Sequence, residues 1–324
     1  MSIKTVAHWS GFTVPVAFAG ALLATIAAST LSVSADPLNN YNLIVLGNMT
    51  ASSDVEGTAF IGGNLNGTSN WGTQLNSAAY AGQNVLTVLG NIGNVSGTDI
   101  QLQAGNLLLG GTVEAGSTVN YNGGGHLVTS PLPSLTNITN TLNSDQAYLA
   151  SLTANSTYTA PAKPTNVTLN ATPSSAGLAV FSIAASSLFG NGNIQSLDIA
   201  TNNASEVVIN VTSGSSVDIS SPNFVNNFTS TSVDSSVIWN FVNATSITLG
   251  VELHGSVLAP GASLSTSSPI DGSVAVGSLN AGSEFHLPLL LPNPHPSTPT
   301  PEPGSVALLM VGAAGLLLIG RKRA

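Results

Sequence analysis

Short runs of hydrophobic residues recur along the middle of the chain, and Gly or Asn residues bound most of them. Runs that are this short and rich in Val, Ile and Leu are typical of β-strands. Gly and Asn tolerate the left-handed backbone that tight corners require. The pattern therefore predicts a mainly β body. The runs lie at residues 42–46, 58–61, 85–89, 106–109, 207–211, 237–241 and 246–249.

Several sequence fragments are repeated. The fragment VLGNM at 45–49 returns as VLGNI at 88–92, and HGSVLA at 254–259 returns 17 residues later as DGSVAV at 271–276. Short strands with Gly and Asn corners and one apolar run per turn are typical of stacked coils. The repeats predict a right-handed β-helix, or β-solenoid-like, body. A Gly-rich β-sandwich without a true repeat is the alternative.

One segment has helical rather than strand periodicity. Apolar residues between 134 and 153 are spaced by three, four or seven positions, which places them on one face of a helix. Pro133 and Ser134 suit the start of that helix. We expect it to cover a flank of the coils, and we expect a loop over 155–173, which holds three prolines. The apolar positions are Leu135, Ile138, Leu142, Leu149 and Leu152.

The first 35 residues have the pattern of a secretory signal peptide. Lys4 provides the positive start, an apolar run covers 14–28, and small residues precede Ala35. The pattern predicts that signal peptidase cuts between Ala35 and Asp36. An uncleaved N-terminal anchor is the alternative.

The C-terminal end has three parts after a Pro-rich linker at 288–300. Pro301, Glu302 and Pro303 come first, and an uncharged stretch of 17 residues follows at 304–320. That stretch is at the short end of what crosses a bilayer as a helix. The basic residues at the very end would hold the C-terminal end of this stretch on the cytoplasmic side. They are Arg321, Lys322 and Arg323.

This end, 301–324, resembles the PEP-CTERM sorting signal of Gram-negative bacteria. The resemblance implies export across the inner membrane and a precursor that is transiently anchored through a transmembrane helix at 304–320. It further implies processing by an exosortase near the Pro-Glu-Pro element and a final location at the cell surface or outside the cell. A plain C-terminal membrane anchor is the alternative.

The body resembles the choice-of-anchor A family, and the resemblance covers most of 40–282. It rests on LGN and VEG followed by FIGGN at 46–64, and on VIWNF, HGSVLAP and DGSV at 237–274, with the helix between the two blocks. It implies an adhesive surface domain with a β-helix-like body, which we place at 36–287. The family has no established catalytic residues, so the resemblance assigns none here.

Charge is scarce, with 5 Lys and Arg and 14 Asp and Glu among 324 residues. Between 36 and 303 the only base is Lys163. The chain therefore lacks the basic stripe that binding to nucleic acid needs, and it lacks the strong bases that polysaccharide lyases use. There is no Cys, which excludes disulfides and Cys-based zinc sites. The two acids at Asp54 and Glu56 are interpreted as a solvated strand edge rather than a glycosidase pair.

Metal ligands are equally sparse when the chain is read in order. His126, His254, His286 and His295 do not lie at metal-ligand spacing, so structural or solvent-facing roles are expected for them. Calcium is the one metal kept open, with oxygen ligands from the turn at 198–203, and no other cofactor is expected.

These observations favour a secreted, surface-sorted adhesin or a structural module of the extracellular matrix or exopolysaccharide. An Asn-, Ser- and Thr-rich surface can bond hydroxyl-rich ligands without charge, and we expect no enzymatic activity. A polysaccharide-degrading β-helix using Asp54 and Glu56 is one alternative. An ice-binding surface protein is the other, although the sequence shows no ordered ladder of Thr-x-Thr repeats, which would favour it.

Overall fold

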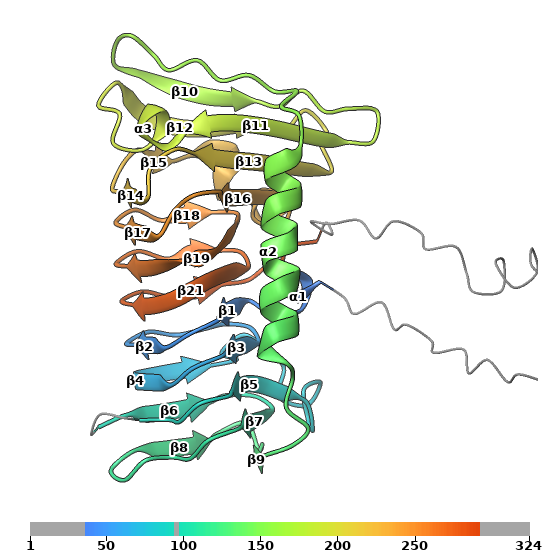
Figure 1. Cartoon of the computed structure of the whole chain (residues 1–324), viewed down its shortest axis with the longest axis vertical. Coiled ribbons are helices and arrows are strands. Elements are labelled where there is room, and N and C mark those ends of the chain that lie inside the picture. Colours follow the sequence, from blue (N-terminus) through green and yellow to red (C-terminus); the bar gives the residue numbers. More distant parts are fainter. Residues whose placement is uncertain (1–35, 94–96, 292–324) are drawn as a thin grey trace, which may run out of the picture. The chain divides into compact units, whose positions relative to one another are not determined.

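The computed structural model describes residues 36–93 and 97–291, in which short parallel strands stack into a coiled body with one long helix along its flank (Figure 1). The predicted signal segment, the linker beyond 291 and the sorting signal with its membrane helix lie outside these residues. Within the described ranges no helix combines the length and the apolar character needed to cross a membrane.

The coils have three faces. The first, the helix-covered face, is a ladder of ten strands, most of them buried on both sides. In spatial order they are β11 (Leu178–Ala184), β13 (Glu206–Thr212), β16 (Val237–Phe241), β19 (Ser256–Thr266), β21 (Val274–Ala281), β1 (Leu43–Val45), β3 (Ala59–Ile61), β5 (Asn84–Val88), β7 (Asn106–Leu109) and β9 (Leu127–Val128).

The second face, here the open face, has one side in the core and one side exposed. It consists of β14 (Ser216–Ile219), β17 (Ser246–Leu249), the second halves of β19 and β21, β2 (Met49–Ala51) and the start of β4 (Leu65–Trp71).

The third face closes each coil. Its strands are β10 (Thr165–Asn170), β12 (Ile194–Ala200), β15 (Asn223–Phe224), β18 (Leu253–His254), β20 (Ile270–Asp271), β22 (Phe285–His286), the end of β4, β6 (Asp99–Leu102) and β8 (Thr118–Tyr121). All strand pairs in the described part are parallel, which fits a solenoid-like body and not an antiparallel sandwich.

The order of the coils in space differs from their order in the sequence. The N-terminal coils run from β1 outward to β9, and helix α2 (Leu135–Ser151) then carries the chain back along the body (Figure 1). The C-terminal coils run from β11 to β21, and β21 pairs with β1. The first and last coils of the described chain therefore meet in the middle of the stack. We call this junction the seam.

The seam is held by a buried Asn side chain. Nδ2 of Asn42 donates to the carbonyl oxygens of Gly272, at 3.0 Å, and His286, at 2.9 Å. Its Oδ1 accepts from the backbone N–H of Gly57 at 3.0 Å. One side chain thus joins the N-terminal and C-terminal coils through three hydrogen bonds.

The repeated fragments are successive coils in register. His254 pairs with Asp271 and Leu258 with Ala275, so the 17-residue echo is one turn of the solenoid. The other echo places Asn residues one above another at a corner. The Oδ1 atoms of Asn48, Asn64 and Asn91 accept from the backbone N–H groups of Asn64, Asn91 and Thr112, at 2.9, 2.8 and 3.0 Å.

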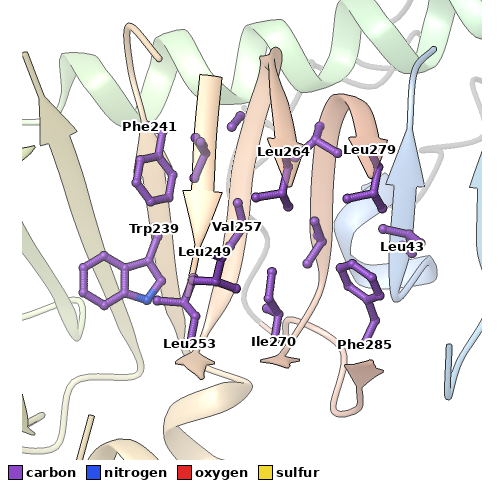
Figure 2. Packing of buried hydrophobic residues seen from close by; sticks show 14 of the residues in the cluster. Leu43, Trp239, Phe241, Leu249, Leu253, Val257, Leu264, Ile270, Leu279 and Phe285 are labelled. Atoms are coloured by element: carbon purple, nitrogen blue, oxygen red, sulfur yellow. The ribbon is translucent and has the colours of Figure 1, made fainter. Parts of the chain in front are cut away.

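The coils enclose a continuous hydrophobic core, part of which is seen in Figure 2. Trp239 and Phe285 are fully buried there, and Phe189 packs against Trp239 with ring centroids 5.8 Å apart. Fully burying one such side chain stabilises the folded state by about 1.5–3 kcal/mol. The interior of the solenoid is therefore a packed core rather than a channel.

Helix α2 lies within the predicted segment and begins with a Ser cap. Oγ of Ser134 accepts from the backbone N–H of Asn137 at 3.2 Å. The helix buries Leu142 and Leu149 in a second cluster, which also contains Ile44, Phe60, Ile238 and Leu258. Helix α2 thus covers the outer side of the helix-covered face.

Some elements were not predicted. Strand β10 lies where a loop was expected, because its alternating side chains are mostly exposed and give no apolar run, while parallel pairing with β12 holds it in place. The prediction of a loop over all of 155–173 is therefore wrong. The short helices α1 (Pro37–Asn40), α3 (Ala185–Leu188) and α4 (Thr231–Asp234) and the 3-10 turn η1 (Asn226–Thr229) also lacked a sequence signal.

Candidate functional site: the open face

The open face presents a row of polar side chains that runs across six coils. These residues occupy the same register position of neighbouring strands, and we call them the central row. All of them are exposed except Asn66, which is half-buried. In spatial order they are Asp218, Thr248, Ser265, Asn280, Thr50 and Asn66.

A second row lies two residues before the central row in the same strands. It consists of Ser216, Ser246, Ser263 and Ser278, and we call it the serine row. Between the rows, Ile247, Leu264 and Leu279 point into the core and are buried. The alternation follows from the two-residue period of a strand, which turns every second side chain outward. The strand signal therefore also determines which residues are presented.

The spacing of each row follows from the stacking of the coils. Neighbouring strands in a sheet lie about 4.8 Å apart, so each outward position repeats at about that interval. A shallow depression of about 280 Å³ lies between the two rows on β17, β19 and β21. Its polar lining consists of Ser246, Ser263, Ser265, Ser278 and Asn280.

The central row is polar but has few internal partners. Within the described residues, Thr248, Ser265, Asn280 and Thr50 make no side-chain hydrogen bond. In the serine row, Ser263 donates to the carbonyl oxygen of Thr245 at 3.3 Å. Hydroxyl and amide groups both donate and accept. The central row therefore offers donors and acceptors to an external ligand at regular intervals.

The part of the third face formed by the end of β4, β6 and β8 is also polar, but its side chains bond to one another. Nδ2 of Asn70 donates to Oδ1 of Asp54 at 2.6 Å, and Nε2 of Gln103 donates to Oδ1 of Asn70 at 3.3 Å. One coil further, Nδ2 of Asn120 donates to Oδ1 of Asp99 at 3.0 Å. These groups mainly connect coils, so this face offers fewer free partners than the open face.

The acids singled out in the sequence lie at the edge of that network. Asp54 and Glu56 flank the buried Val55, and both are half-buried. Oε2 of Glu56 accepts from the backbone N–H of Leu287 at 2.8 Å. Both carboxylates thus keep some contact with solvent and are also bonded to neighbouring segments.

The turn proposed for calcium has a different set of contacts. Oδ1 of Asp198 accepts from the backbone N–H of Asn227 at 3.0 Å, and Oδ2 accepts from Nδ2 of Asn226 at 3.3 Å. Nδ2 of Asn202 donates to the carbonyl oxygen of Ala171 at 2.8 Å. The Asp198 carboxylate thus orders the η1 turn, and calcium binding there stays a prediction.

Of the predicted processing residues, only Asp36 lies among the described residues. Its Oδ1 accepts from the backbone N–H of Leu38 at 2.9 Å, which caps α1. The others, Ala35, Pro301, Glu302, Pro303, Arg321, Lys322 and Arg323, lie outside them.

Two histidines that are distant in the sequence are brought together on the third face. His254 and His286 both pair in register with Asp271, whereas His126 is exposed elsewhere. Burial alone would lower the pKa of His254, but hydrogen bonds to Asp234 and Asp271 outweigh it and raise that pKa to about 9. The sequence reasoning missed this group because it compared spacing along the chain. The signal was present, since His254 and Asp271 begin the two copies of the 17-residue echo.

The family described as "Putative Ice-binding-like adhesive domain" matches residues 34–287. No curated protein matches the chain in sequence.

Solved structures of ice-binding proteins are similar to the chain, with TM-scores of 0.35 or less. The protein of the Antarctic ascomycete Antarctomyces psychrotrophicus has 14% identity and a TM-score of 0.35, covering 79% of this chain and 99% of its own. A protein of an Antarctic Flavobacteriaceae bacterium has 13% identity and a TM-score of 0.33, covering 77% and 81%. The Shewanella frigidimarina ice-binding protein 1 domain has 10% identity and a TM-score of 0.29, covering 78% of this chain and 97% of its own.

Proposed function

Because the chain belongs to the ice-binding-like adhesive domain family, we propose that it is a surface adhesin whose open face binds an uncharged extracellular polysaccharide. The observation that carries the proposal is the central row, in which the exposed Thr248, Ser265, Asn280 and Thr50 repeat in register and, among the described residues, make no side-chain hydrogen bond. The role proposed is binding and not catalysis.

A neutral polysaccharide suits this face chemically. Each sugar hydroxyl both donates and accepts hydrogen bonds, as do the Ser, Thr and Asn side chains of the two rows. Between 36 and 303 there are 14 acids and one base, and this net negative charge would repel a polyanion. An extended polymer that contacts several coils at once gains from many weak contacts, because each further contact is intramolecular.

Delivery to the surface is part of the proposal. The N-terminal pattern at 1–35 would direct export, with signal peptidase as the processing enzyme. The resemblances to the choice-of-anchor A family and to the PEP-CTERM signal support exosortase processing at 301–303 and a membrane-anchored precursor. The mature body would then work at the cell surface or in the matrix of a Gram-negative bacterium.

The test is binding of the purified chain to cellulose and to dextran resin, with alginate as a charged comparison. Thr248→Tyr and Ser265→Tyr should each lower binding by about tenfold or more, because a large ring covers the row. Thr168→Tyr is the matched control, since Thr168 is exposed on β10 of the third face. Equal binding by all four proteins, or loss only in Thr168→Tyr, would refute the proposed face.

Ice is a second candidate ligand, favoured by the regular spacing of the two rows. Stacking of the coils aligns outward side chains from different strands, so a regular row forms without an ordered Thr-x-Thr ladder in the sequence. Thr occupies only two positions of the central row, Thr50 and Thr248. Measuring inhibition of ice recrystallisation with the same variants separates the two ligands. Inhibition lost in Thr248→Tyr, without binding to either neutral polysaccharide, would favour ice.

A further inference from the structure

Three side chains from neighbouring segments converge on one point of the third face. Nδ1 of His254, on β18, lies 3.1 Å from Oδ1 of Asp234, at the end of α4. The same Nδ1 atom lies 3.1 Å from Oδ2 of Asp271, on β20. The three side chains are almost enclosed, with 6% of His254, 8% of Asp234 and 15% of Asp271 exposed.

The protein's own groups satisfy this arrangement incompletely. One ring N–H has a single proton, yet two carboxylates face it at equal distance. His286 bonds to the other oxygen of Asp271, so the two oxygens that face Nδ1 of His254 share its one proton, and Lys163, the single Lys or Arg between 36 and 303, lies in the exposed approach to β10. A divalent cation would contact both of these oxygens and Nδ1 at once, whereas a proton on Nδ1 bonds well to only one of the two oxygens.

The geometry suits a transition-metal ion. Around a tetrahedral zinc ion with bonds of about 2.0–2.2 Å, neighbouring ligand atoms lie about 3.3–3.6 Å apart. The two 3.1 Å separations are within a few tenths of an ångström of that range, and one ligand atom from each residue lies within 4.8 Å of the others. We propose that Asp234, His254 and Asp271 form a binding site for one divalent zinc ion.

Neighbouring groups hold these ligands in place, as the outer partners in metal sites do. Nδ1 of His286 lies 2.6 Å from the second oxygen of Asp271, and Nε2 of His286 lies 2.8 Å from Oε2 of Glu284. Nε1 of Trp239 donates to the backbone carbonyl of His254 at 2.8 Å. Asp271 thus keeps one oxygen for His286 and turns the other toward His254.

The ion would serve as a clamp. It would join α4 to the coils of β18 and β20 through side chains, beside the core residues Leu253 and Ile270. The open face takes no part in it. Zinc binding and ligand binding at the open face are therefore separate properties, and either can fail without the other.

The experiment uses the full chain purified without a His tag, stripped with chelator and then incubated with zinc chloride. We expect about one zinc ion per chain by mass spectrometry of the metal content, and a tetrahedral Co²⁺ absorption band on cobalt substitution. At free zinc about a hundredfold above the dissociation constant, the melting temperature should rise by about 5–10 °C.

His254→Gln and Asp271→Asn should abolish both the bound zinc and the melting shift. His126→Gln is the matched control, because His126 is exposed and away from the cluster, and it should behave as wild type. Retained stoichiometric zinc in folded His254→Gln and Asp271→Asn would overturn the site. If those variants do not fold, the wild type decides: no bound zinc, no cobalt band and no melting shift would overturn it equally.

Discussion

The open face and the third face come from the same coils, yet they use their polar side chains differently. On the third face, Asp, Asn, Gln and His side chains reach the neighbouring coil and bond there, as Asn70 does with Asp54. On the open face, short Ser and Thr side chains stand in register, and those of the central row have no such bonds in the described part. Polar side chains of the third face therefore connect coils, whereas those of the central row leave a surface available to bind.

The largest expected difference concerns the seam. Asn42→Ala removes three hydrogen bonds and leaves buried backbone groups unpaired, so we expect a loss of about 3–5 kcal/mol in the free energy of unfolding. Asn280→Ala makes the same change at an exposed position of the central row and should alter stability by less than about 0.5 kcal/mol. Urea denaturation measures both. Similar values for the two variants would contradict the contrast between connecting and presenting side chains.

The next effect concerns pH. Burial, with the nearby Asp36 carboxyl as a further cause, raises the pKa of Asp145 in α2 from 3.8 to about 8. The folded state therefore holds a proton that the unfolded state releases, so stability should fall as pH rises from about 4 to about 8. Because solvent screens part of the effect and Asp36 shares in the titration, the loss should be on the order of 2 kcal/mol rather than the full equivalent of the pKa shift.

Asp145→Asn is the variant that tests this cause, because its side chain stays neutral and the fall should become smaller. Burial also raises the pKa of Glu206, to about 7, so a residual fall is expected in that variant. Denaturation at several pH values measures both proteins. An unchanged pH profile in Asp145→Asn would exclude this carboxyl as the source.

A smaller effect is expected at Asp99, which lies on β6 of the third face. The Asp99 carboxylate accepts hydrogen bonds from Gln101, Thr118 and Asn120, partly in solvent. Asp99→Ala should cost about 1–2 kcal/mol, whereas Asp218→Ala, at an exposed position of the open face, should be nearly neutral. Thermal unfolding of both variants measures this difference in stability. An Asp99→Ala variant as stable as the wild type would mean that the hydrogen bonds to the Asp99 carboxylate do not stabilise the coils.

Local features of the fold were predictable from the sequence, and features that depend on stacking were not. The run VIWNF and the spacing of Leu135, Leu142 and Leu149 are local signals, and β16 and α2 lie there. The meeting of β1 with β21 depends on the return of the chain along α2, for which periodicity gives no signal. The central row has the same origin, since Thr50 and Asn280 become neighbours only across the seam.

The most direct test of the open face as the binding surface is side-chain footprinting with a soluble neutral oligosaccharide such as cellohexaose. Covalent labelling with and without the sugar would be compared across the described residues. We predict protection of peptides from β17, β19 and β21, centred on Thr248, Ser265 and Asn280. Protection confined to the end of β4 and to β6 and β8, on the third face, with the open face unchanged, would contradict the proposal.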